Sequence, residues 1–410
     1  MSDQGEKELK ILLILPFFYP HRGGSQKYAE EIYAKMMINH PNVKVDVLAY
    51  NTDRGTEFEE YRGFRIYRIP CWNIIPARFA LAKPWALIKK LNELAKNDYD
   101  YINTHIRFFD PTWWVWLYAR KAHAKSFFTG HVATHPIHQN KVVEIVSKSV
   151  DLTLAKWSLN KYNLITFTNR TAEKFFREKL GLKKESHIIY GGIDTEFFSP
   201  QIKKGRILPK VETKIDDSTV LITYVGRMIW TKGVTYFYEA IKSFLSSNRK
   251  DVVFVLAGPG ELEQQLREQI SQDRLEDKVI MTGDLEYKQV RDLLAISDVF
   301  INPSHHNEGF PNTILEAGAS GCYVIATDNA GTWEVIKNGE TGQLIPQKDT
   351  AAMAVAIEWA LNNESSRIEI AQRFRQLLME DFDWNVISEK LYILLLEKIK
   401  KQGALTYQHQ

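Results

Sequence analysis

Two glutamates, Glu308 and Glu316, flank a short loop that leads into an apolar segment. Pro311 suits the first turn of a helix, where its missing N–H leaves no intrahelical partner unpaired, so we expect a helix over 312–320. The free N–H groups and positive dipole at a helix start favour an anionic ligand such as a phosphate. The two carboxylates can accept hydrogen bonds from sugar hydroxyls. This arrangement is therefore suited to holding a nucleotide sugar.

Two cations follow another expected strand, in the segment Tyr224-Val-Gly-Arg-Met-Ile-Trp-Thr-Lys-Gly233. Gly226 permits a tight exit from that strand. Arg227 and Lys232 then lie in a loop from which a fork-shaped donor and a point charge can neutralise a diphosphate. The alternative is that both are ordinary solvated cations at the edge of a sheet. The segment lacks the glycine and lysine spacing of a Walker loop.

Two glycines, Gly23 and Gly24, follow the first expected strand and would let backbone approach a ligand closely. We expect Ser25 to be the N-cap of the helix that follows, which runs through Met36. Gly-Gly turns are also common as simple tight connections, and that alternative stays open.

His131 comes directly after a buried strand, at the carboxyl edge where open α/β sheets bind ligands. A structural role is the alternative, and His105 has a similar position with weaker support. His305 and His306 adjoin Glu308 but lack the i, i+4 helical spacing of a zinc pair, so we predict no metal site.

The composition is that of an ordinary globular protein of 410 residues. Fifty-three basic and 50 acidic residues give a net charge of +3, too weakly basic to indicate a nucleic-acid partner. Only two cysteines occur, Cys71 and Cys322, which fits a reducing compartment. The acidic start is unlike a signal peptide, and no apolar run reaches the roughly 18 residues of a membrane span. We expect a cytoplasmic protein that is soluble or peripheral on a membrane.

Short apolar runs alternate with segments of helical period, which is typical of α/β domains with parallel sheets. The expected strands are 10–16, 43–49, 99–103, 126–129, 164–168, 219–225, 252–257, 278–282, 299–302 and 323–326. The series restarts after a Gly191-Gly192 turn and a lysine-rich linker. We predict one domain over 1–195, a second over 196–384, and a terminal helix over 385–402.

Aromatic and cationic side chains gather in the first half of the chain, a combination that suits an anionic membrane surface. The aromatic residues are Trp72, Phe79, Trp85, Trp113, Trp114 and Trp116, and the cations are Arg78, Lys83, Lys89, Lys90 and Lys96. Ile88, Leu91 and Leu94 have helical spacing and can equally form the core face of a crossover helix.

Taken together, these segments resemble the group 1 family of retaining glycosyltransferases with the GT-B fold, which includes bacterial mannosyl- and glucosyltransferases. The strongest match is Glu308-Gly-Phe-Pro-Asn-Thr-Ile-Leu-Glu316. Other segments match in the family's order along nearly the whole chain: Gly23-Gly24, Thr129-Gly130-His131, Ile193-Asp194, Arg227 to Lys232, Gly331-Thr-Trp-Glu334 and Asn338-Gly-Glu-Thr-Gly342. The resemblance implies two Rossmann-like, doubly wound domains facing a cleft. The first would bind the acceptor, the second the nucleotide sugar, and the terminal helix would cross back to the first.

The resemblance also implies roles for individual residues. Glu316 would hold the nucleotide ribose, and Glu308 would hold the donor sugar together with the backbone of Gly309, Phe310, Pro311, Asn312 and Thr313. Arg227 and Lys232 would stabilise the leaving diphosphate, Gly24 would help from the opposite domain, and His131 would contact the donor sugar. The family needs no metal or cofactor, and the leaving phosphate can take the acceptor proton. Electrostatic stabilisation and exclusion of water by domain closure would then be the main contributions.

The implied reaction is transfer of a hexose from a UDP- or GDP-linked sugar to a lipid-linked or polysaccharide acceptor. Two alternatives are a nucleotide-sugar 2-epimerase of the same fold and a catalytically silent carbohydrate-binding homologue. Gly191-Gly192 stands where many members have Asn-Gly, so the contact of that asparagine is not carried over. No motif in the first domain identifies the acceptor.

Overall fold

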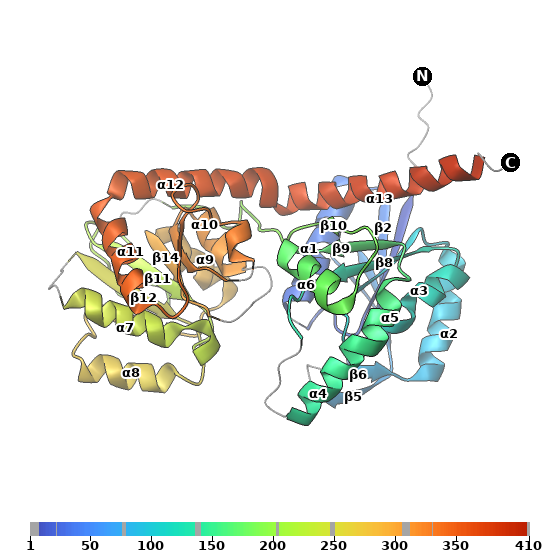
Figure 1. The fold of residues 1–410 in the computed structure, drawn as a ribbon, viewed down its shortest axis with the longest axis horizontal. Helices are drawn as coiled ribbons and strands as arrows, with labels where there is room; N and C mark the ends of the chain where they lie inside the picture. Colours follow the sequence, from blue (N-terminus) through green and yellow to red (C-terminus); the bar gives the residue numbers. More distant parts are fainter. Residues whose placement is uncertain are drawn as a thin grey trace, which may run out of the picture. The chain divides into compact units, whose positions relative to one another are not determined.

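The computed structural model describes residues 8–21, 23–75, 79–135, 141–201, 205–246, 251–305, 312–329 and 331–407. The chain forms two units, shown in Figure 1: Met1–Gly191 with Trp384–Gln410, and Gly192–Asp383. The first boundary thus falls before the predicted 195/196 division. The reason is local, because Ile193 N–H donates to Phe382 O (2.9 Å) and Thr195 Oγ1 donates to Asp383 Oδ2 (2.6 Å), which ties both residues to the second unit.

An eight-stranded, mostly parallel sheet forms the centre of the first unit, in the order β10-β9-β8-β7-β1-β2-β4-β3. Its strands are β1 (Leu9–Leu15), β2 (Val43–Tyr50), β3 (Phe58–Tyr61), β4 (Phe64–Ile69), β7 (Tyr101–His105), β8 (Lys125–Gly130), β9 (Leu164–Phe167) and β10 (His187–Ile188). Only β3 runs antiparallel to its neighbour, β4. A separate antiparallel hairpin joins β5 (Cys71–Ile75) and β6 (Phe79–Ala82).

Helices cover both faces of this sheet, so its central strands are apolar on both sides. The helices are α1 (Gly24–Asn39), α2 (Pro84–Leu94), α3 (Pro111–Lys121), α4 (Lys141–Val150), α5 (Lys156–Leu159), α6 (Arg170–Leu180) and α13 (Trp384–Tyr407). Along β1, Ile11 and Leu13 pack in a cluster with α1 and α13, whereas Leu12 and Ile14 pack in a second cluster with α2, α3 and α6. Because successive side chains of a strand point to opposite faces of the sheet, β1 contributes to both core clusters.

The second unit is built on a six-stranded parallel sheet in the order β13-β12-β11-β14-β15-β16. The strands are β11 (Val220–Val225), β12 (Val252–Ala257), β13 (Val279–Gly283), β14 (Val299–Asn302), β15 (Tyr323–Thr327) and β16 (Gln343–Ile345). The helices are α7 (Val234–Leu245), α8 (Glu263–Gln272), α9 (Tyr287–Ile296), α10 (Asn312–Ala319), α11 (Thr350–Asn362) and α12 (Glu364–Leu377). Helices α7, α8, α11 and α12 share one core cluster, and α9 contributes to a separate one.

All ten predicted strands are present, with ends that differ from the predicted ones by at most two residues. The predicted helix over 312–320 is present as α10, and the terminal helix begins at Trp384. The sequence reasoning missed β3 to β6, β10 and β16. Most of these lie at or near the sheet edges, or in the separate hairpin, where the apolar signal is weaker.

Candidate functional site

The carboxyl ends of β11 and β14 mark the point in the second unit where the strand order reverses. From β11 the chain moves outward to β12 and β13, and it returns to place β14, β15 and β16 on the other side. Open α/β sheets bind ligands beyond the strand ends at such a point. Arg227 and Lys232 follow β11, and the loop that contains Glu308 follows β14.

Backbone hydrogen bonds fix the loop that carries Arg227. Gly226 N–H donates to Ala257 O (3.0 Å), Met228 N–H donates to Pro259 O (2.8 Å), and the Tyr224 hydroxyl donates to Arg227 O (2.9 Å). The neighbouring loop approaches so closely that a Cβ on Gly258 would lie 2.2 Å from Gly226 O. The Arg227 side chain is exposed above this anchored backbone. The guanidinium of Arg227 is therefore exposed, while the backbone that carries it is held by hydrogen bonds.

Lys232 ends a short 3-10 turn, Trp230–Lys232, that packs against the loop after β14. A Cβ on Gly233 would lie 2.0 Å from Pro303 O, and His305 N–H donates to Thr231 O (3.2 Å). Ser304 O accepts from the hydroxyl of Thr327 and the amide of Asn329. The backbone that leads into residues 306–311 is thus held beside Lys232.

The remaining predicted residues of this unit lie on or before α10. Glu316 is buried on that helix, and Asn312 and Thr313 form its first turn. Glu308, Gly309, Phe310 and Pro311 fall outside the described residues. The structure thus brings Gly226, Arg227 and Lys232 to one sheet edge with the start of α10.

In the first unit, the carboxyl edge of the sheet gathers the other predicted residues. The strand order reverses between β1 and β7; Gly23 and Gly24 follow β1, while His105 ends β7. The prediction that Ser25 caps α1 is wrong, because Gly23 is the N-cap and Lys27 N–H donates to Gly23 O (2.9 Å). Apart from its two chain neighbours, no atom of the described residues lies within 4 Å of a Cβ built on Gly24.

His131 and His105 form a hydrogen-bonded pair at this edge. His131 Nε2 lies 3.0 Å from His105 Nδ1, and His105 Nε2 lies 2.7 Å from Asn103 Oδ1. Burial lowers the pKa of His131 to about 3 and lowers the pKa of His105 well below its usual value. Both rings are therefore neutral at pH 7. The edge of the Tyr28 ring packs on His131, with 5.0 Å between ring centroids.

A buried ion pair that the sequence reasoning missed holds the loop after His131. Arg107 Nε donates to Asp151 Oδ1 (2.8 Å), and the two side chains are 2% and 0% exposed. The same guanidinium donates to the carbonyls of Val132 and Thr134. Arg107 follows β7 at the carboxyl edge, a position that could have drawn attention to it. Asp151 gave no such signal, because it lies in a π-helical segment, Asp151–Ala155, distant in sequence.

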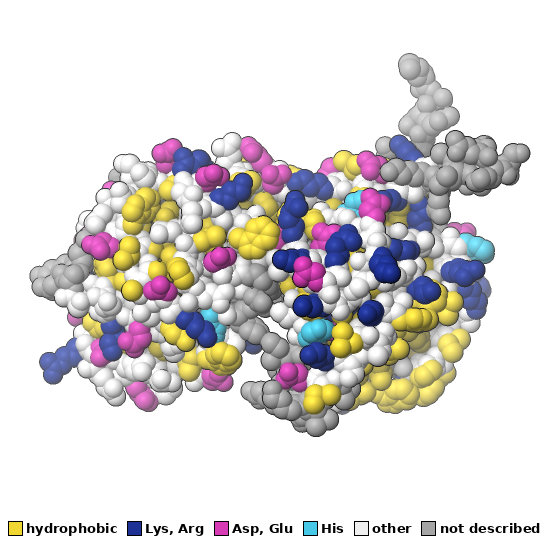
Figure 2. Space-filling view, in the orientation of Figure 1, with side chains coloured by type: hydrophobic (Ala, Val, Ile, Leu, Met, Phe, Trp, Pro, Cys, Tyr) yellow, Lys and Arg dark blue, Asp and Glu magenta, His cyan; other side chains and the backbone are white. Residues whose placement is uncertain are grey.

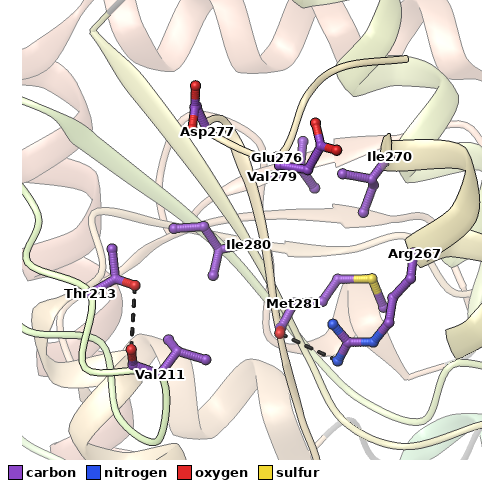
Figure 3. Close-up of a pocket in the computed structure, with 9 residues that line it drawn as sticks. All are labelled: Val211, Thr213, Arg267, Ile270, Glu276, Asp277, Val279, Ile280 and Met281. Carbon is purple, nitrogen blue, oxygen red and sulfur yellow. Dashed lines mark hydrogen bonds between the residues drawn. The ribbon is translucent and has the colours of Figure 1, made fainter. Parts of the chain in front are cut away.

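One surface pocket of the second unit lies away from these loops. Figure 3 shows it beside the edge strand β13, with Arg267 donating to Met281 O (3.4 Å) and with Glu276 and Asp277 among its lining residues. None of the predicted site residues lines it.

The described residues contain no group of three or more His, Cys, Asp or Glu side chains placed to hold a metal ion. Within the described part of the chain, every helix is too short or too polar to span a bilayer.

Two family models match the chain, one over each unit. The model of glycosyl transferases group 1 matches residues 208–377, and that of glycosyltransferase family 4 matches residues 22–197. An uncharacterized glycosyltransferase of Methanocaldococcus jannaschii is 22% identical over 400 residues, which cover 96% of this chain and 99% of that protein.

A second relative and a solved structure have more specific names. The UDP-Gal:alpha-D-GlcNAc-diphosphoundecaprenol alpha-1,3-galactosyltransferase of Escherichia coli is 28% identical over 282 residues, covering 64% of this chain and 67% of that protein. The crystal structure of Anabaena Alr3699/HepE in complex with UDP is similar to this chain with a TM-score of 0.73 and 17% identity. The similarity covers 95% of this chain and all of that one.

Proposed function

Because this chain belongs to the group 1 glycosyltransferases and has the GT-B fold, we propose that it transfers a hexose from a nucleotide sugar to a lipid-linked or polysaccharide acceptor. The transfer proceeds with retention and without a metal. Of the two carriers that the sequence suggests, UDP and GDP, UDP has the stronger support, since the Anabaena structure holds UDP and the E. coli relative is named for UDP-Gal. The diphosphoundecaprenol in that relative's name supports a lipid-linked acceptor.

The observation that carries this proposal is the close packing of the loop that follows β11 against the loop that follows β14. Gly233 and Pro303 pack too closely for any side chain between them, which places the backbone of Lys232 next to the backbone that enters residues 306–311. A preorganised cation stabilises developing charge without reorganising during the reaction. Lys232 and Arg227 neutralise the leaving diphosphate, and Glu316 accepts hydrogen bonds from the ribose.

The test is a transfer assay with Lys232→Ala and Glu316→Ala. Loss of one preorganised charged donor reduces catalysis by about 10²- to 10³-fold, so we expect Lys232→Ala to fall by that much. Lys288→Ala is the matched control, because Lys288 is exposed on α9. A thermal-shift panel with UDP and GDP sugars identifies the carrier, since a donor bound to the folded state raises its melting temperature. Full activity in both variants would refute the site assignment.

We also propose that the first unit docks on an anionic membrane through an apolar patch formed by the β5–β6 hairpin and α2. Trp72, Ile74, Trp85 and Ile88 are 47%, 54%, 64% and 59% exposed. In Figure 2, hydrophobic side chains gather at the edge of this unit where Figure 1 places α2, β5 and β6. Exposed apolar patches of this kind mark interaction sites, and a tryptophan beside a lysine suits the interface with lipid headgroups.

The sequence of α2 was compatible with a membrane-facing surface and with the core face of a crossover helix. The structure shows that α2 has both an apolar core face and an apolar exposed face. Leu91 and Leu94 are buried, whereas Trp85 and Ile88 point to solvent. Lys83 Nζ lies 5.9 Å from the centroid of the Trp85 ring, so a cation accompanies the exposed aromatic side chain. The other tryptophans of the cluster, Trp113, Trp114 and Trp116, are half-buried and donate hydrogen bonds within the unit.

Liposome cosedimentation tests the membrane proposal. We expect the protein to bind anionic vesicles at low salt and Trp85→Ser/Ile88→Ser to weaken binding more than tenfold, since each large apolar side chain contributes about 1.5–3 kcal/mol when fully buried. Ile38→Ser is the control, because Ile38 is 69% exposed on α1, outside this patch. Absence of wild-type binding would end this proposal and leave the transferase assignment unaffected.

A further inference from the structure

The hydrogen bonds around Asn103 leave only one orientation for its side-chain amide. Asn103 Nδ2 lies 3.1 Å from Phe127 O, which can only accept, so the nitrogen must face that carbonyl. Asn103 Oδ1 then accepts from the Tyr33 hydroxyl (3.0 Å) and faces His105 Nε2 at 2.7 Å. All of these groups are buried. The amide oxygen therefore requires a proton on His105 Nε2.

The proton on His105 Nε2 determines which nitrogen of His131 carries a proton. A neutral imidazole carries one N–H, so His105 with a proton on Nε2 has Nδ1 as an acceptor. His131 Nε2 lies 3.0 Å from that acceptor and must donate to it. Among the described residues, Tyr28 makes ring contacts with both histidines and Tyr33 is linked to the pair through Asn103, and neither is a carboxylate that would hold a cationic ring.

We infer that Asn103 and His105 are positioning residues that hold His131 in the Nε2–H tautomer and leave its Nδ1 as a hydrogen-bond acceptor for the ligand. Among the described residues, Nδ1 of His131 has no hydrogen-bond partner, and the residue is only partly buried. An acceptor nitrogen suits a sugar hydroxyl, which donates, and does not suit a phosphate oxygen. The ligand assignment rests on the proposed function, whereas the tautomer rests on the hydrogen bonds alone.

The tautomer is measured directly by side-chain ¹⁵N NMR of the full-length protein at pH 7, because protonated and unprotonated ring nitrogens have different shifts. We expect His131 to carry its proton on Nε2 and to be neutral. A proton on Nδ1, or a cationic ring, would overturn the inference. This measurement needs no substrate and no activity, so it stands even if the protein proves not to transfer a sugar.

Two substitutions of His105 separate positioning from packing. In His105→Asn the amide oxygen takes the place of Nδ1 and can still accept from His131, whereas in His105→Gln the amide reaches toward Asn103 and leaves His131 without its acceptor. We expect His105→Gln to shift His131 toward the other tautomer and to weaken UDP-glucose binding about threefold to tenfold, the usual range for one hydrogen bond. His105→Asn should stay within about twofold.

Binding of UDP supplies the internal control, since UDP lacks the sugar hydroxyls. We expect its affinity to be the same in the wild type and in both variants. Equal losses for UDP and UDP-glucose would show that His105 acts only through packing and would overturn the positioning role. Should the wild type bind neither UDP nor UDP-glucose while the tautomer is as expected, UDP is not the carrier and the tautomer assignment stands.

Discussion

Replacing Asp151 with asparagine should destabilise the first unit strongly, because it removes the countercharge of a buried arginine. Asp151 is 0% exposed and Arg107 is 2% exposed, with separations of 2.8 and 3.2 Å between their bonded atoms. Breaking a buried pair costs about 3–5 kcal/mol, since the remaining charge stays desolvated. The carbonyls of Val132 and Thr134 still accept from Arg107 but do not supply a full negative charge.

Hydrogen exchange of peptides from β7 and β8 measures this loss, and peptides from β11 serve as the reference within the same protein. We expect the free energy of opening to fall by about 3–5 kcal/mol in the first unit only. The control is Glu178→Gln, because Glu178 pairs with Lys174 at 3.9 Å on the exposed surface of α6. That change should cost less than about 1 kcal/mol.

A double variant separates the charge effect from general disruption of the loop. Arg107→Met/Asp151→Leu replaces both charges with apolar groups, so it should lose less stability than the sum of the two single changes. Equal effects of Asp151→Asn and Glu178→Gln would refute the reasoning, since burial would then make no difference to the pair.

Two further predictions concern Gly233 and the partly buried His131. Gly233→Ala should lower the stability of the second unit by more than Gly339→Ala. Both glycines have φ near +70°, but of the two only Gly233 would bring a Cβ against backbone, at 2.0 Å from Pro303 O. Thermal unfolding measures both variants, and equal losses of stability would contradict the close approach. The left-handed φ alone costs roughly 1–2 kcal/mol. The first unit should also lose stability as the pH falls from about 6.5 toward 3, because the unfolded chain, with an ordinary histidine pKa of about 6.5, binds the proton that folded His131, with a pKa of about 3, does not. The effect is at most about 1.4 kcal/mol per pH unit for this residue; hydrogen exchange at several pH values measures it, and an unchanged slope in His131→Phe would contradict it.

The middle strands of both sheets could be predicted from the sequence because helices cover both of their faces. Residues of β1 and β12 are almost continuously apolar, which is a strong local signal. The strand β4 could not be predicted in this way, since it contains Arg65 and Arg68. Arg65 is exposed and pairs with Asp46 on β2 at 2.7 Å, a contact that no local pattern records.

The residues of the candidate site likewise fall into those that the local sequence indicates and those that depend on contacts distant in sequence. The positions of His131, Arg227 and Lys232 followed from their place after a strand, which the sequence displays. The amide of Asn103 and the carboxylate of Asp151 act through partners that only the folded chain brings near. The Ser25 prediction failed for a related reason, because the Ser25 hydroxyl donates to Gln26 Oε1 (3.1 Å) and the helix starts at Gly24, two residues earlier than a Ser25 cap would place it.

The first unit is discontinuous along the chain, and this has a consequence for its synthesis. Leu391 and Leu395 of α13 are buried in the same cluster as β1, and the Tyr101 hydroxyl donates to Leu395 O (2.8 Å). One layer of the amino-terminal core therefore comes from residues that are synthesised after the whole of the second unit. The second unit, Gly192–Asp383, is complete in sequence before that layer exists. Since domains fold as units during translation, the unit that is begun first is the one that finishes folding last.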